Sequence, residues 1–135
     1  MLQELIIDIS DYSMVKILGV GTYGNVYLVE EKKTKKLYAA KVSKTGCIDK
    51  QNQTTFFQEL IALSKMKNAA ILSLRGFSMV DFQMKYHPTI LIQYMPNGSL
   101  ANLIVNNNKF PLSKKYIILL RIAEGMKYLH SIAWF

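Results

Sequence analysis

The sequence predicts an α+β fold, because strand-forming segments fill its first part, helices fill its last, and the change falls near residue 96. Three β-rich segments come first, at 12–19, 25–30 and 37–43. A helical segment and two further strand candidates follow them. Half of the 135 residues are apolar, which is enough for one compact core.

The segments at 25–30 and 37–43 are expected to form an antiparallel hairpin, because the link between them is too short for a crossover helix. This link is rich in lysine, which occupies positions 32, 33, 35 and 36. We interpret it as a solvated turn, with an anion-binding patch as the alternative.

A helix is expected from Thr55 to about Asn68. Thr55 and Gln58 have the spacing of a capping box, and apolar residues then recur at helical intervals. The strand candidates 70–79 and 89–95 follow.

Ser99 is expected to cap a short helix that reaches Ile104, and Pro111 to open a longer one. The longer helix is apolar over most of its circumference, so it needs cover from other elements. We expect the 135 residues to leave it partly uncovered, and the chain to self-associate through residues 114–135.

Composition limits the function classes. The formal net charge of +8 would suit nucleic acid, but no aromatic residues alternate with the lysines, so nucleic-acid binding is the weakest hypothesis. The longest apolar run is far short of a membrane span, and the N-terminus lacks the features of a signal peptide. With a single cysteine, these features predict an intracellular, cytoplasmic protein with no membrane partner.

Residues 19–24 read Gly-Val-Gly-Thr-Tyr-Gly, a pattern shared by dinucleotide-binding folds and by phosphate-covering hairpins. In the dinucleotide folds a helix follows the last glycine, and an acidic residue stands about 20 positions on. Here strand residues follow Gly24, and the cation Lys41 stands at that distance. Both departures favour a glycine loop between two antiparallel strands that covers phosphates. An ordinary glycine-rich turn is the alternative.

Lys41 and Glu59 are the candidate catalytic pair. Lys41 stands in an apolar strand segment, and Glu59 stands among apolar neighbours on the expected helix. A carboxylate in such surroundings needs a cation. The two side chains can therefore satisfy each other and hold a positive charge beneath the glycine loop.

With these motifs in place, the sequence resembles the protein kinase superfamily from about Tyr12 to Phe135, most closely its tyrosine-kinase-like serine/threonine group. Residues 18–26 are similar to its glycine-rich loop, and 38–41 to its Val-Ala-Ile-Lys motif. Residues 91–100 resemble its hinge, and 122–130 its helix αE. The resemblance implies a kinase N-lobe, which is a five-stranded antiparallel sheet with helix αC, followed by the first helices of a truncated C-lobe.

The resemblance also assigns domains and sites. It implies an N-terminal extension at 1–11, an N-lobe with ATP site and hinge at 12–95, and a partial C-lobe at 96–135. Lys41 would pair with the ATP phosphates, and Glu59 with Lys41. The residues implied in ATP binding are Leu18, Gly19, Val20, Gly21, Thr22, Tyr23, Gly24, Asn25, Val26, Ala39, Lys41, Ile92, Gln93 and Met95. Ile92 resembles the gatekeeper, while the Gln93 carbonyl and the Met95 amide would bond the adenine.

No metal ligand is implied within the chain, because the family's His-Arg-Asp and Asp-Phe-Gly motifs would follow Phe135. Asp81-Phe82-Gln83 precedes the hinge and lacks the glycine, so we interpret it as a surface loop. The intact protein is expected to transfer phosphate from ATP to Ser or Thr, or else Tyr, of a protein substrate, with Mg²⁺ present only in the intact kinase. The alternative is a non-catalytic nucleotide- or partner-binding module. The 135 residues alone are expected to be inactive.

Overall fold

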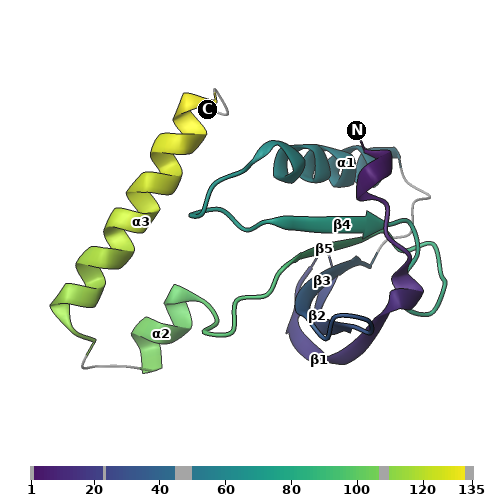
Figure 1. Cartoon of the computed structure of the whole chain (residues 1–135), viewed down its shortest axis with the longest axis horizontal. Helices are drawn as coiled ribbons and strands as arrows, with labels where there is room; N and C mark the ends of the chain where they lie inside the picture. Colours follow the sequence, from purple (N-terminus) through teal and green to yellow (C-terminus); the bar gives the residue numbers. More distant parts are fainter. Residues whose placement is uncertain (1, 23, 45–49, 107–109, 133–135) are drawn as a thin grey trace. The chain divides into compact units, whose positions relative to one another are not determined.

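A computed structural model of the chain describes residues 2–22, 24–44, 50–106 and 110–132 (Figure 1). It contains two compact units. The N-terminal unit consists of Met1–Met66 and Ser73–Tyr94, and the C-terminal unit of Lys67–Leu72 and Met95–Phe135. Strands dominate the first unit and helices the second, so the α+β prediction is confirmed.

The N-terminal unit is built on one five-stranded sheet with the order β1-β2-β3-β5-β4, and every neighbouring pair is antiparallel. Its strands are β1 (Tyr12–Val20), β2 (Gly24–Glu31), β3 (Leu37–Ser43), β4 (Leu74–Ser78) and β5 (Thr89–Gln93). The hairpin expected from the short lysine-rich link is the β2–β3 pair. All five strand candidates are confirmed, although the last two are shorter than the sequence indicated.

Strand register divides the sheet into two faces, because directly paired residues point to the same side. Val26 pairs with Lys41, Leu28 with Ala39, and Ala39 also with Ile92. We call this side the helix face. Tyr27 pairs with Ala40, which pairs with Leu91. We call that side the outer face.

Helix α1 (Lys50–Lys65) covers the helix face. Leu60 is fully buried there against Phe77 and Ile90. The helix begins before the expected Thr55, so the capping-box prediction is wrong. Residues 50–53 are lysine, glutamine and asparagine without a helix breaker, and the helix extends through them.

The N-terminal residues pack against both faces of the sheet. They form two 3₁₀ turns, η1 (Gln3–Leu5) and η2 (Ile9–Asp11), which Figure 1 shows in purple, with η1 beside α1. The Ile7 amide donates to the Phe77 carbonyl on β4 at 2.9 Å. Ile9 is buried in the core of the outer face, whereas Leu5 packs with the core beneath α1.

The C-terminal unit contains α2 (Leu100–Asn106) and α3 (Leu112–Ser131). The Ser99 hydroxyl accepts a hydrogen bond from the Asn102 amide at 3.2 Å, which confirms the expected cap. The Tyr128 hydroxyl of α3 accepts one from the Lys67 amide at 2.9 Å.

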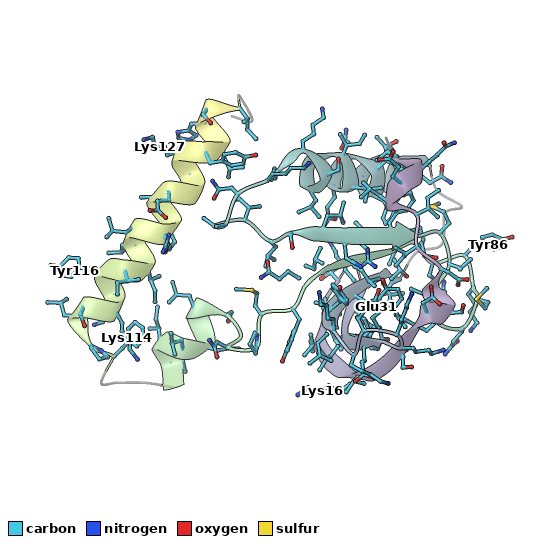
Figure 2. The ribbon with its side chains drawn as sticks, viewed as in Figure 1. Lys16, Glu31, Tyr86, Lys114, Tyr116 and Lys127 are labelled. Carbon is cyan, nitrogen blue, oxygen red and sulfur yellow. The ribbon has the colours of Figure 1, made fainter. Side chains whose placement is uncertain are left out.

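Most of α3 is exposed. Figure 2 shows its side chains, among them the labelled Tyr116. The exposed apolar residues are Leu112, Tyr116, Ile117, Leu119, Leu120, Ile122 and Met126. These side chains belong to the helix that was expected to lack cover. None of the helices in the described ranges has the length and apolar character that a membrane span needs.

We expect Ile9→Ala to lower the free energy of unfolding by about 2–5 kcal/mol, since it removes a side chain that is only 3% exposed. The matched control is Ile6→Ala, whose side chain is 60% exposed and which should change stability by no more than about 0.5 kcal/mol. Urea titration of both variants measures the difference. Equal effects would show that the N-terminal segment is not part of the folded core.

Candidate functional site

The centre of the candidate site is an ion pair between β3 and α1. The ammonium nitrogen Nζ of Lys41 lies 2.7 Å from both Oε1 and Oε2 of Glu59. Strand β3 presents Lys41 on the helix face, because Lys41 pairs with Val26 on one side and Ile90 on the other. One carboxylate thus holds the ammonium through two charge-assisted hydrogen bonds.

This pair adds little to stability. The Lys41 and Glu59 side chains are 41% and 38% exposed, and ion pairs that reach water contribute about 0–1 kcal/mol. Two-point contact with Glu59 instead restricts where the ammonium can lie. Since a lysine ammonium carries three donors, it can still donate toward an anion from solvent.

An apolar surface lies beside the pair on the helix face. Ala39 is buried between Leu28 and Ile92, its partners on the neighbouring strands. Val26 pairs with Gly19 at the end of β1. Leu18 lies at an irregularity in β1, between Ile17 and Gly19, and is partly exposed. The register thus brings Val26, Ala39, Lys41 and Ile92 together on one face.

The glycines of the loop differ in how much space surrounds their Cα atoms. A Cβ atom on Gly24 would lie 2.4 Å from the Val42 carbonyl oxygen of β3, so the fold itself requires this glycine. The Gly21 amide donates to the Gly24 carbonyl at 2.9 Å, which closes the turn. A Cβ on Gly19 would meet no atom within 4 Å. Packing within the chain therefore gives no reason for a glycine at 19, whereas close approach of a ligand would.

Several expected residues do not join this group. Asn25 pairs with Val42 on the outer face, and its amide nitrogen Nδ2 donates to the Tyr27 hydroxyl at 3.2 Å. Val20 and Thr22 are exposed at the loop. Gln93 ends β5, and its amide donates to the Ser73 carbonyl at 2.9 Å. Met95 belongs to the C-terminal unit, and Tyr23 lies outside the described residues.

Asp81 has a role that the sequence did not reveal. The loop between β4 and β5 was expected, but Asp81 is buried rather than at the surface. Its carboxylate accepts hydrogen bonds from the amides of Gln83 at 2.8 Å and Lys85 at 3.1 Å, and contacts the His87 ring nitrogen Nδ1 at 2.8 Å. Burial raises the pKa of this carboxyl, but these partners outweigh burial, and its pKa lies below the usual value.

Glu31 is a second buried acid that the sequence did not single out. Its carboxylate accepts from the Thr34 hydroxyl and from the Arg75 guanidinium, the latter at 2.8 Å. These hydrogen bonds, the Thr34 bond foremost, lower the pKa of Glu31. Figure 2 labels Glu31 within the N-terminal unit. This acid connects β2, the lysine-rich turn and β4, so it serves the fold.

No metal site accompanies the pair. Within the described ranges, no three His, Cys, Asp or Glu side chains gather closely enough to hold a metal ion.

Comparison with known proteins identifies the family of the chain. The protein kinase domain family matches residues 12–133, and the chain belongs to that family. It is 35% identical to "Protein kinase 3" of Dictyostelium discoideum over 127 aligned residues. The alignment covers 91% of this chain and 13% of that protein. It is 30% identical over 122 residues to "MAP3K epsilon protein kinase 2" of Arabidopsis thaliana, an alignment that covers 89% of this chain and 9% of that protein. It is 30% identical over 105 residues to human "Rho-associated protein kinase 1", which aligns over 78% of this chain and 8% of the relative. The chain thus spans about a tenth of these relatives.

The two glycines at 19 and 24 make a matched pair for testing. We expect Gly24→Ala to lower the free energy of unfolding by about 1–3 kcal/mol, because the new methyl group would meet a backbone oxygen. Gly19→Ala should leave stability unchanged or raise it by up to about 1 kcal/mol, while weakening ATP binding. Thermal unfolding and ATP titration of each variant measure both effects. Unchanged ATP affinity in a folded Gly19→Ala variant would mean that no ligand approaches this glycine closely.

Proposed function

We propose that the helix face of the sheet, with the glycine loop, binds ATP, and that Lys41 donates to the α- and β-phosphates. The observation that supports this most strongly is the Lys41–Glu59 contact at 2.7 Å in a partly exposed position. It adds little to the fold, yet it fixes a cation beside the loop. Membership of the protein kinase domain family, over residues 12–133, supports the same reading.

We assign individual roles by the resemblance to the family. Val26, Ala39 and Leu18 would contact one side of the adenine ring, and Ile92 would border the pocket as gatekeeper. The Gln93 carbonyl and the Met95 amide would bond the adenine edge. Gly19 to Gly24, together with Asn25, would supply backbone around the phosphates. For Asn25 that contribution is limited to its backbone, because its side chain lies on the outer face.

In the intact protein, we propose phosphoryl transfer from ATP to serine or threonine of a protein substrate. When bound, magnesium would neutralise the phosphate charge, through ligands other than the described residues. Lys41 would orient the phosphates, and Glu59 would keep Lys41 in place. The single cysteine and the use of ATP both suit a cytoplasmic location.

An acyl-phosphate ATP probe, which acylates lysines near bound phosphate, tests the binding proposal. We expect it to label Lys41 in preference to Lys44, the exposed lysine that follows β3. Excess ATP should suppress labelling of Lys41 at least tenfold and leave Lys44 unchanged. Mass spectrometry of the labelled chain reads both sites. Equal labelling of the two lysines, with no effect of ATP, would contradict the proposal.

The 135-residue chain alone is expected to transfer no phosphate, with Mg²⁺ or with Mn²⁺, because the described residues hold no metal site and positioning without charge neutralisation is insufficient. Incubation with radiolabelled ATP and a general protein substrate measures this. The control is Lys41→Met. Incorporation into the unmodified chain above the level of that control would show that these residues suffice for catalysis.

We also propose that the isolated chain self-associates through the exposed face of α3. Leu119 and Leu120 are 61% and 64% exposed beside other apolar side chains, and such surfaces promote association. Light scattering coupled to size-exclusion chromatography should give a mass above 15.4 kDa. Replacing both leucines with glutamate should restore the monomer, whereas Lys127→Glu on the same helix should not. A monomeric unmodified chain would refute this proposal.

A further inference from the structure

The outer face of the sheet carries a cavity that the ATP proposal does not use. It has a volume of about 270 Å³ and lies entirely within the N-terminal unit. Asn25 and Tyr27 of β2 and Val42 of β3 form its floor, and Phe82 of the β4–β5 loop forms part of its wall. Because Asn25 pairs with Val42 while Val26 pairs with Lys41, this cavity and the Lys41–Glu59 pair lie on opposite faces.

The floor of the cavity contains a carboxamide whose hydrogen-bonding capacity is mostly unused. Asn25 donates through Nδ2 to the Tyr27 hydroxyl, but its oxygen Oδ1 is buried and has no hydrogen-bond partner among the residues that the structure describes. A buried acceptor without a donor is unfavourable, and most such groups in proteins are satisfied. The terminal torsion of asparagine is broad, so a modest rotation can turn Oδ1 toward a donor in the cavity.

The charges around the cavity favour an anion. Lys44, Lys85 and His87 line it together with one acid, Asp81. That acid is occupied by the amides of Gln83 and Lys85 and by His87. Across the described ranges, neither Lys44 nor Lys85 has a carboxylate partner. Two unpaired cations therefore border a cavity whose carboxylate is already satisfied within its own loop.

The loop that carries these groups is well defined. The Asp81 amide and the Lys85 carbonyl bond at 2.9 Å, and the Ser43 amide donates to the Pro88 carbonyl at 2.9 Å. Met84 adopts a positive φ of 60° within this turn. Lys85 and His87 are thus held over the end of β3, where Lys44 stands, rather than arranged on a free loop.

We propose that this cavity binds a small organic anion that carries a hydroxyl group, its acid group between Lys44 and Lys85 and its hydroxyl donating to Asn25 Oδ1. Tyr27 and Phe82 supply aromatic walls for the carbon skeleton. The cavity is separate from the proposed ATP site, because it lies on the other face of the sheet. Phosphate and carboxylate are both compatible with the two lysines.

Glycerol 2-phosphate is a suitable probe, because it combines a phosphate with free hydroxyl groups. Saturation-transfer difference NMR on the whole 135-residue chain measures its dissociation constant, and this method tolerates self-association. Inorganic phosphate and glycerol are the reference ligands. We expect glycerol 2-phosphate to bind at least tenfold more tightly than either. Replacing both Lys44 and Lys85 with alanine should weaken it at least tenfold, whereas the matched control Lys33→Ala, in the exposed turn, should not.

Asn25→Leu separates the hydroxyl contact from the charge contact. It should weaken glycerol 2-phosphate about tenfold and leave inorganic phosphate unaffected. Lys41→Met should leave the ratio of the two affinities, glycerol 2-phosphate over inorganic phosphate, unchanged, whatever it does to ATP, so failure of this proposal and failure of the ATP proposal are distinguishable. Equal binding of phosphate and glycerol 2-phosphate, or equal loss in the Lys33→Ala control, would overturn the proposal. Lys44 and Lys85 are exposed, so the variant with alanine at both positions should fold and still decides the test if Asn25→Leu does not fold.

Discussion

The arrangement of the N-terminal unit depends on how a lysine can be held on the apolar side of a sheet. Lys41 lies on the same face as Val26 and Ile90, its cross-strand partners. The Lys41 side chain still reaches water, and α1 brings the Glu59 carboxylate to within 2.7 Å of its ammonium. The buried contacts of Leu60 with Phe77 and Ile90 fix the register of helix and sheet that allows this contact. Apolar packing of α1 on the sheet therefore sets the positions of Lys41 and Glu59, and their ion pair forms as a result.

The space around each glycine of the loop separates a glycine that the fold requires from one that it does not. Gly24 is required by the close approach of β2 to β3, where the Val42 carbonyl leaves no room for a side chain. Gly19 has open space around it. Within one glycine motif, Gly24 is thus needed for the close packing of β2 on β3, whereas Gly19 borders open space. The sheet also has a second usable face. Asn25, next to Gly24 in sequence, faces away from Lys41 because of the two-residue repeat of a strand.

Much of this could be predicted from the sequence. Alternation and turn residues located β1, β2 and β3 to within one residue at each end, and the need of Glu59 for a cation predicted its contact with Lys41. The start of α1 could not be found, because glutamine and lysine fit a helix or a loop equally well. The packing of Ile9 into the core was missed because two short 3₁₀ turns carry no periodic pattern. Glu31 and Asp81 were missed for another reason. Arg75, the partner of Glu31, comes from β4, whereas the partners of Asp81 lie within its own loop and meet it only once that loop has folded.

The central claim is that the Lys41–Glu59 pair serves ligand binding rather than stability, and a double-mutant cycle tests it most directly. Lys41→Met, Glu59→Gln and the double variant would each be measured for free energy of unfolding and for ATP affinity. Our account predicts a coupling energy below about 1 kcal/mol for unfolding, as for other ion pairs that reach water. For ATP binding it predicts strong coupling, so that Glu59→Gln costs affinity only while Lys41 is present. Strong coupling in unfolding with additive effects on ATP affinity would contradict it.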